Sequence, residues 1–378
     1  MIAGGGTGGH ICPGVAIADA IVEQSAGSEV FFMGRSGSIE ERVVGQSGYP
    51  FVSVPSMGLR RGLDARNLAV PFAVGAGYLT ALARLATIRP EAAVGTGGFV
   101  SLPPIVAART LGVPVVLQEQ NSYPGLATRV LSPLASAVHT VFEETERHLP
   151  RARSVVVSGN PIRRGFATAD RDRAREKLGL ADAGTVVFFL GGSRGARRIN
   201  RAVAGAADAL RDAGVALIVQ TGDADAPEVT AALENAGARA VVKAFYDDVA
   251  SAYAASDLVV SRAGATTISE IALMGLPSVL VPYPHATEGH QMKNALTMEK
   301  AGAAVVVPDQ ECTSERLADV VRGLIEDRKR LASMADAAGT LARPDAATRV
   351  ARAVLALVGG ATDAGAPGLL DSEEGRES

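Results

Sequence analysis

The sequence has few cysteines, no excess of positive charge and no uninterrupted apolar run of membrane-spanning length. Its two cysteines, Cys12 and Cys312, lie far apart without metal-ligand spacing, which indicates reduced, packed thiols in a reducing compartment. The formal net charge of −3 argues against bulk electrostatic binding, so nucleic acid is not an expected partner. We expect no secretory signal, because the chain enters a glycine-rich turn within its first residues.

The most apolar stretch, residues 68–88, contains Pro71, Gly75 and Gly77, so we do not expect it to span a membrane. The favoured interpretation is a core helix with a solvated edge. The alternative is an interfacial surface that touches anionic lipid, because the stretch has basic margins. These margins are Arg60, Arg61, Arg66, Arg84 and Arg89.

Short apolar segments alternate with helical patterns along the 378 residues, which is typical of parallel βαβ units and predicts an α/β fold. The length allows two or three domains, and a charged, less patterned segment places a boundary near Arg163. A last helical pattern precedes a tail, residues 359–378, whose composition predicts disorder. Expected strands are 30–33, 51–54, 92–94, 113–117 and 137–140, then 186–190, 217–220, 240–243, 258–261, 278–281 and 304–306.

Two glycine-rich turns, residues 4–10 and 191–196, each follow an apolar run and precede a helical pattern. Glycines let the backbone approach a ligand closely, and a helix N-terminus favours anions. The pair therefore predicts two α/β halves that face one another across a cleft. Pro13 fits the first position of the helix after the first turn.

Neither turn matches a nucleotide fingerprint completely. Residues 4–9 fit the dinucleotide pattern GxGxxG, but the next strand ends at Gly34-Arg35 without the required carboxylate, so NAD binding is the weaker interpretation. The second turn lacks the lysine of a nucleoside triphosphatase, although the Ser193 hydroxyl and backbone amides could hold a diphosphate.

Two further segments place polar groups at the ends of expected strands. After strand 258–261, a helix that begins near Thr266 forms another anion-binding N-terminus. Glu270, one turn later, either accepts hydrogen bonds from two vicinal hydroxyls or only complements the helix dipole. Residues 119–121 follow strand 113–117, where polar side chains of a parallel sheet point into the ligand crevice.

No metal site or cofactor is expected. The spacing of His285 and His290 fits no helical ligand pair, and no third ligand is evident. Two Asp-x-Asp triplets, at 170–172 and 223–225, lie in charged loops beside helices rather than at the end of an apolar strand.

Taken together, these sequence motifs resemble those of the MurG family of peptidoglycan N-acetylglucosaminyltransferases. The resemblance implies a GT-B fold, with two Rossmann-like domains facing a cleft. The implied parts are an acceptor-binding, membrane-associating domain at 1–162, a UDP-GlcNAc domain at 163–342, a helix at 343–358 packing back on the first domain, and a disordered tail at 359–378. The matching phrases, in family order, are 4–10, 97–101, 119–121, 159–163, 191–196, 261–270, 290–291 and 294–295.

The resemblance also implies an activity. It is inverting transfer of GlcNAc from UDP-GlcNAc to the C4 hydroxyl of muramic acid in undecaprenyl-linked lipid I, giving lipid II. The enzyme would lie at the cytoplasmic face of the cell membrane, with anionic lipid and cell-wall and division proteins as further partners. The alternatives are a GT-B UDP-sugar transferase with a different acceptor, or a non-catalytic UDP-sugar-binding protein.

The family pattern assigns roles to positions of this chain. Thr7, Gly8, Gly9 and Asn121 fall near the donor sugar and its phosphates, and Arg163 with the Tyr246 backbone near uracil. Ser193, Ala265, Thr266 and Thr267 fall at the diphosphate, Glu270 at the ribose hydroxyls and Gln291 at the GlcNAc hydroxyls. Phe99 stands where the family commonly has tyrosine.

Inversion needs a base that deprotonates the acceptor hydroxyl on the face of the sugar opposite the leaving group. His10 is our first candidate, since imidazole is the side chain whose unperturbed pKa lies near physiological pH. Glu119 is the reserve candidate.

Overall fold

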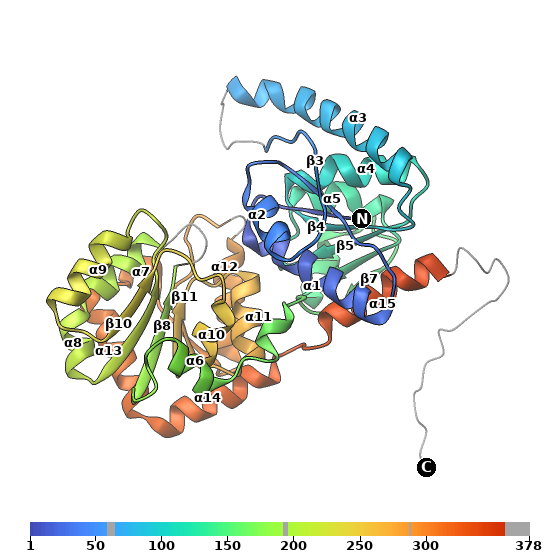
Figure 1. Cartoon of the computed structure of the whole chain (residues 1–378). Helices are drawn as coiled ribbons and strands as arrows, with labels where there is room; N and C mark the ends of the chain where they lie inside the picture. Colours follow the sequence, from blue (N-terminus) through green and yellow to red (C-terminus); the bar gives the residue numbers. More distant parts are fainter. Residues whose placement is uncertain (59–64, 192–195, 287–288, 360–378) are drawn as a thin grey trace, which may run out of the picture.

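A computed structural model of the chain describes residues 1–58, 65–191, 196–286 and 289–359. These residues form two α/β domains that lie side by side, each with a parallel sheet between helices (Figure 1). The expected GT-B architecture of two Rossmann-like domains is therefore confirmed.

The N-terminal sheet has the strand order β3-β2-β1-β4-β5-β6-β7, with every pair parallel. Its strands are β1 Ile2–Gly4, β2 Phe32–Gly34, β3 Phe51–Ser53, β4 Ala93–Gly97, β5 Val115–Glu119, β6 Ala137–Thr140 and β7 Val155–Val157. Its helices are α1 Gly8–Gln24, α2 Ile39–Gln46, α3 Val70–Ile88, α4 Leu102–Thr110 and α5 Leu126–Leu131.

The C-terminal sheet has the order β10-β9-β8-β11-β12-β13, again all parallel. Its strands are β8 Thr185–Leu190, β9 Val215–Gln220, β10 Ala240–Lys243, β11 Leu258–Ser261, β12 Ser278–Leu280 and β13 Ala304–Val306. Its helices are α6 Arg171–Lys177, α7 Arg197–Gly205, α8 Ala207–Asp212, α9 Ala226–Asn235, α10 Val249–Ala254, α11 Ala265–Leu273, α12 His290–Lys300, α13 Ser314–Glu326 and α14 Arg328–Thr340, and the chain continues into α15 Ala346–Gly359.

Every expected strand has a counterpart in these two sheets. No strand was predicted at β7, whose three valines are half-buried or exposed at the edge of the sheet. Strand β7 is as long as β2, β3, β12 or β13, but it lies in the charged, less patterned segment that we interpreted as the domain boundary.

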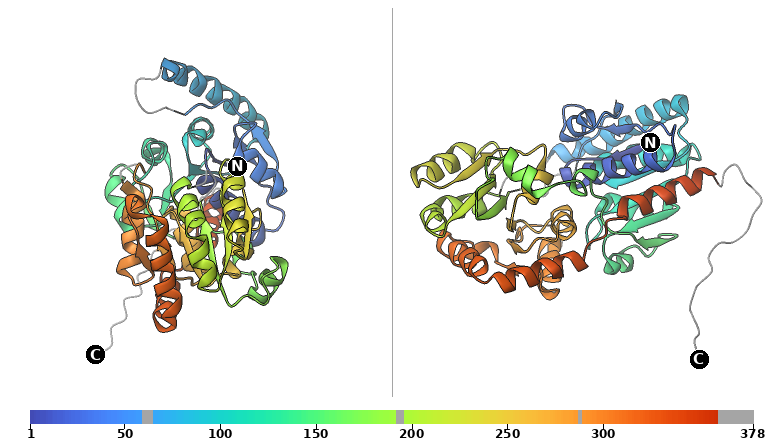
Figure 2. Two further views of the ribbon diagram at one scale, coloured as in Figure 1. Left: turned by 90° about the vertical axis from the view of Figure 1, so that its left-hand side faces the viewer. Right: turned by 60° about the horizontal axis from the view of Figure 1, so that its bottom comes forward.

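The last helix, α15, returns to the N-terminal domain, where it packs against α1 (Figure 2). Val350, Ala351 and Val354 are buried in the same apolar cluster as Ile17 and Ile21 of α1. The domain limits at 162 and 342 stay a prediction, and the expected tail from residue 360 onward lies outside the described residues.

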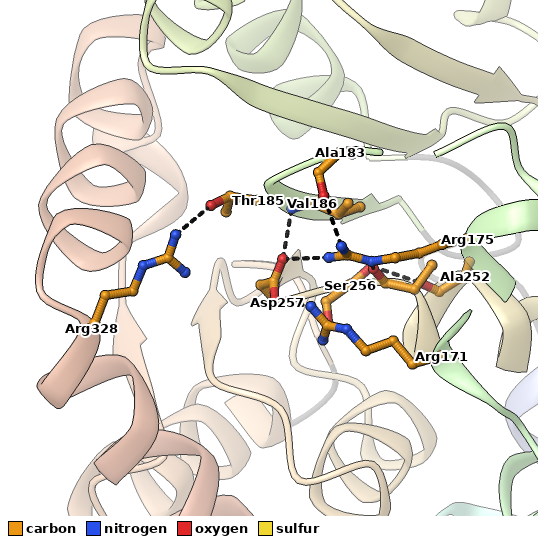
Figure 3. Close-up of polar contacts among 10 residues, drawn as sticks. Arg171, Arg175, Ala183, Thr185, Val186, Ala252, Ser256, Asp257 and Arg328 are labelled. Carbon is orange, nitrogen blue, oxygen red and sulfur yellow. Dashed lines mark hydrogen bonds and ion pairs between the residues drawn. The ribbon is translucent and has the colours of Figure 1, made fainter. Parts of the chain in front are cut away.

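An ionic cluster fixes α6 against the amino ends of the C-terminal strands, on the side away from the strands' carboxyl ends (Figure 3). Asp257 accepts hydrogen bonds from the Val186 backbone N–H at 2.8 Å and from the Arg175 guanidinium at 2.9 Å, and it also pairs with Arg171. Arg175 in turn donates to the carbonyls of Ala183 and Ala255. Because these groups satisfy one another, the cluster holds the sheet that positions the ligand-facing loops.

Helix α3 overturns part of the expectation for residues 68–88. It is a single helix that runs through Gly75 and Gly77, and by length and composition alone residues Asn67–Ile88 suffice to cross a membrane. It is not a core helix, because only Gly77, Ala81 and Leu85 are buried along it. A Cβ at Gly77 would lie 2.2 Å from the Pro55 carbonyl oxygen, so this glycine permits close packing instead of breaking the helix.

Candidate active site

Both sheets change direction of strand order beside their first strand, and ligands of such folds bind at the carboxyl ends of the strands near this switch point. In the N-terminal domain the switch lies between β1 and β4, and in the C-terminal domain between β8 and β11. The segments that follow β1 and β11 carry residues 7–10, 265–267 and Glu270. Glu119 and Asn121 lie at the end of β5, Tyr246 follows β10 and Gln291 follows β12. Figure 1 shows α1 and α11, which begin after β1 and β11, on the facing sides of the two domains.

Helix α1 begins at Gly8, five residues before the expected start at Pro13, so that expectation was wrong. Thr7 is its N-cap, and no described side chain caps its first turn. Pro13 lies inside the helix and has no N–H, so the carbonyl of Gly9 lacks its usual helical donor. That carbonyl instead accepts a hydrogen bond from the Thr266 hydroxyl at 3.4 Å, and this bond joins the two domains.

The imidazole of His10 lies in the first turn of α1 and touches the loop after β4. Its Nδ1 is 2.9 Å from Oε1 of Gln120. A Cβ at Gly97 would lie 3.0 Å from Nδ1, and one at Gly98 would lie 3.3 Å from Cδ2, so these glycines leave room for the ring. Both have positive φ, +97° and +76°, which other residues rarely adopt.

Hydrogen bonds join Glu119 to Asn121, so the two residues are not independent site groups. The Glu119 carboxylate is buried and accepts hydrogen bonds from the Asn121 backbone N–H, the Asn121 side-chain amide and the Gly125 N–H, at 3.0, 2.9 and 3.0 Å. A carboxylate engaged in this way anchors the loop, which favours His10 over Glu119 as the base.

The first turn of α11 holds Ala265, Thr266 and Thr267 at the carboxyl end of β11. Its N-cap is Gly264, and no described side chain caps it. The first backbone N–H groups of the helix therefore keep their capacity to bind an anion, which the helix dipole favours.

Glu270 lies one turn further along α11 and is 9% exposed. The Tyr253 hydroxyl donates to its Oε2 at 3.0 Å. Burial raises the pKa of Glu270 to about 7, although the hydrogen bond from Tyr253 and the charge of Arg163 act in the opposite direction. Burial also raises the pKa of the Cys12 thiol on α1. The positive charge of Arg163 lowers this pKa, and the negative charge of Glu270 raises it. Arg163, Glu270 and the start of α1 thus share one region.

Tyr246 offers only part of its backbone to a ligand. Its side chain packs in the core of the C-terminal domain, with the hydroxyl donating to the Val241 carbonyl at 2.9 Å. Its backbone N–H donates to Oε1 of Gln220 at 3.0 Å and is therefore already engaged. Only the carbonyl of Tyr246 is left for a uracil contact.

Gln291 lies in the first turn of α12, where its Oε1 accepts from the Tyr283 N–H at 2.9 Å. The side-chain amide is then the group left to donate to a sugar. Ser193 lies outside the described residues. Within the described part of the chain, no three His, Cys, Asp or Glu side chains gather as a metal site, and the absence of a protein-held metal stays an expectation.

Several functional neighbours were missed by sequence reasoning. Gln220 ends β9, so the signal used for residues 119–121, a polar side chain at a strand end, would have found it. Gln120 belongs to the polar segment 119–121, but no role was predicted for it. Tyr253 is buried near the end of the short helix α10, and nothing in its local sequence distinguishes it from a core residue.

Two Rossmann-like domains that meet at the glycine-rich start of α1 and the uncapped start of α11 define the GT-B class of nucleotide-sugar enzymes. Two family profiles match this chain. The glycosyltransferase family 28 N-terminal domain matches residues 1–140, and the glycosyltransferase family 28 C-terminal domain matches residues 186–350. The chain belongs to the MurG family of N-acetylglucosaminyltransferases within this group.

Similarity to individual proteins extends over almost the whole chain. A Desulforudis audaxviator protein is 38% identical over 96% of this chain and 99% of its own length, and one from Salinibacter ruber is 42% identical over 94% and 96%. Both are named UDP-N-acetylglucosamine–N-acetylmuramyl-(pentapeptide) pyrophosphoryl-undecaprenol N-acetylglucosamine transferase. The crystal structure of Acinetobacter baumannii MurG has a TM-score of 0.70 and 29% identity, covering 94% of this chain and 98% of that one.

Proposed function

We propose that this chain is the inverting transferase that moves GlcNAc from UDP-GlcNAc to the C4 hydroxyl of MurNAc in undecaprenyl-pyrophosphoryl-MurNAc-pentapeptide. The product is the disaccharide-linked lipid used in peptidoglycan synthesis. The observation that carries the proposal is the near-full-length similarity to relatives that bear this activity in their names. The contacts of Glu270 and His10 and the uncapped start of α11 support it.

The donor lies against the C-terminal domain in this proposal. Glu270 accepts hydrogen bonds from the ribose hydroxyls, since its carboxylate is held from behind by the Tyr253 hydroxyl. Arg163 and the carbonyl of Tyr246 contact uracil, and the amide of Gln291 contacts the sugar hydroxyls. The diphosphate faces the first turn of α11, with Ser193 as a further donor.

Transfer is a single displacement at the anomeric carbon. The acceptor oxygen forms a bond to C1 while the bond from C1 to the diphosphate oxygen breaks, and the electron pair leaves with UDP. His10 takes the hydroxyl proton as general base. The N–H groups and dipole of α11 stabilise the charge that develops on the diphosphate, a contribution that a fixed, uncapped helix start provides without reorganisation.

A docking surface for the membrane-anchored acceptor is provided by α3. We define the α3 patch as the exposed apolar side chains Leu68, Phe72 and Leu79, which are 77%, 80% and 64% exposed. Phe72 and Leu79 are seven residues apart and lie on one side of α3, and Leu68 lies in the short 3-10 helix, Ala65–Ala69, just before it. The opposite side packs on α4, so the helix lies along the domain surface, a geometry suited to the membrane interface.

Basic residues at the margins of this patch would attract anionic lipid. Arg84 lies in the last turns of α3 and Arg89 is its C-cap. Arg60 and Arg61 lie outside the described residues, and the side chain of Arg66 is not described. The protein is thus a peripheral enzyme of the cytoplasmic membrane face, and contacts with cell-wall and division proteins belong to the same proposal.

The test is a coupled UDP-release assay with UDP-GlcNAc and a lipid I analogue, with simple sugars as comparison acceptors. We expect release only with the lipid analogue. UDP release with simple sugars alone would support a different acceptor, and no release with either would support a binding protein. His10→Ala should lower kcat by about a hundredfold or more while UDP affinity is kept, and near-normal turnover would rule out His10 as the base.

A further inference from the structure

The side-chain amide of Gln120 has only one chemically possible orientation. Its Nε2 is 3.0 Å from the carbonyl oxygen of Thr96 and 3.3 Å from that of Gln118. Carbonyl oxygens only accept hydrogen bonds, so the group that faces them must be the NH₂. Gln120 is 2% exposed, and turning the amide over would place its oxygen against two other buried oxygens.

This orientation determines which nitrogen of His10 carries the proton. With the NH₂ fixed on the two carbonyls, the Gln120 oxygen faces His10 Nδ1 at 2.9 Å. An amide oxygen can only accept, so the neutral imidazole is protonated on Nδ1. Nε2 then keeps its lone pair, and none of the described residues hydrogen-bonds to it.

The loop after β4 restricts the orientation of the His10 ring. Positions Gly97 and Gly98 border the two sides of the ring, the first near Nδ1 and Cε1 and the second near Cδ2. Turning the imidazole by 180° would bring a carbon to Gln120 and leave the buried amide oxygen without its donor. The ring therefore has one favourable orientation as well as one tautomer.

We propose that Gln120 is a positioning residue that selects the Nδ1–H tautomer of His10 and so presents Nε2 as the proton acceptor. The proposal rests on the proposed function of His10 as general base. As the acceptor oxygen bonds to C1, its proton passes to Nε2, and UDP leaves with the electron pair of the broken bond. The imidazolium that results keeps its Nδ1–H on Gln120, where the hydrogen bond becomes charge-assisted.

The direct test is the tautomer itself, measured by ¹⁵N–¹H correlation spectra of protein labelled in its five histidines. The His10 signals are assigned by their loss in His10→Ala. We expect the Nδ1–H form in the unmodified protein and a mixture with the Nε2–H form in Gln120→Met, which keeps the chain length but removes the acceptor. An Nε2–H tautomer in the unmodified protein would overturn the proposal.

Kinetics give the second readout. Gln120→Met should lower kcat by about tenfold or more, with the KM for UDP-GlcNAc unchanged, because only the base is affected. Gln118→Met is the matched control, since Gln118 is also buried, two residues earlier in β5, but donates to the Gly159 carbonyl. Unchanged tautomer and kcat in Gln120→Met would contradict the proposal.

The tautomer measurement separates this proposal from the assignment of His10. If His10→Ala retains normal turnover, His10 is not the base, whatever its tautomer. If His10→Ala is inactive but the unmodified protein shows Nε2–H, His10 remains the base and the role of Gln120 fails.

Discussion

Glu270→Gln should make the protein more stable at alkaline pH while weakening UDP binding. The carboxylate of Glu270 is buried, and burial raises its pKa to about 7 from an ordinary value of 4.5. Its ionised form therefore costs folding free energy. Glutamine has nearly the same shape, can accept the hydrogen bond from Tyr253, and never ionises.

The size and sign of the effect follow from the two pKa values. Between pH 4.5 and 7 the folded state binds more protons at this site than the unfolded state, so stability falls as the pH rises. Above pH 7 the loss is complete. At 1.36 kcal/mol per pKa unit it amounts to about 3 kcal/mol, which is the largest gain that the substitution can give.

Urea unfolding followed by circular dichroism at pH 5 and pH 8.5 measures this difference, and calorimetric titration with UDP measures the binding. We expect the variant to exceed the unmodified protein in stability mainly at pH 8.5. The unmodified protein should bind UDP less tightly below pH 7, because a protonated carboxyl accepts hydrogen bonds less well. The exposed Glu234→Gln in the same domain is the control. An equal stability difference at both pH values would refute the reasoning.

Three further predictions concern the membrane surface, the ionic cluster and the glycine turn. Phe72→Glu should weaken binding to anionic vesicles about tenfold or more in co-sedimentation, because it removes a large apolar side chain, whereas Val22→Glu on α1 should not. Asp257→Ala should destabilise the protein by about 3 kcal/mol and lower Tm, since it leaves Arg175 buried without its partner, whereas the exposed Asp182→Ala should leave Tm unchanged. Gly8→Ala adds a methyl group that meets no described atom within 4 Å, so it should raise the KM for UDP-GlcNAc without loss of Tm, and Gly45→Ala in α2, equally open, should change neither.

The sequence predicted the fold well because parallel strands buried on both faces leave continuous apolar runs. It failed where tertiary contacts decide the outcome. Pro13 is compatible with a first helical turn, but α1 starts at Gly8, and the Gly9 carbonyl that proline leaves without a helical donor accepts a hydrogen bond from Thr266 of the other domain. The glycines of α3 suggested an interrupted helix. Gly77 does not interrupt it, because a glycine is needed there for the close approach of the Pro55 backbone.

The candidate site shows the same division. Glu270, His10 and the start of α11 were predicted because strand ends and helix starts are marked in the sequence. The partners that orient them, Tyr253 and Gln120, could not be assigned, since a buried tyrosine or glutamine has no local pattern that names its partner. The hydrogen bond from Tyr253 to Glu270 joins residues 17 positions apart, and the one between His10 and Gln120 joins residues 110 positions apart.

The contact between Gly9 and Thr266 connects the two halves of the proposed chemistry. Gly9 immediately precedes His10, and consecutive Cα atoms are about 3.8 Å apart. Thr266 belongs to the helix start that faces the diphosphate, so the base and the leaving-group site are separated by little more than one residue and one hydrogen bond. A displacement with inversion needs the base and the leaving group on opposite faces of one sugar ring. In the proposed reaction the glycine-rich turn at residues 4–10 would therefore serve both substrates, its backbone next to the donor-side helix α11 and its imidazole acting as base toward the acceptor hydroxyl.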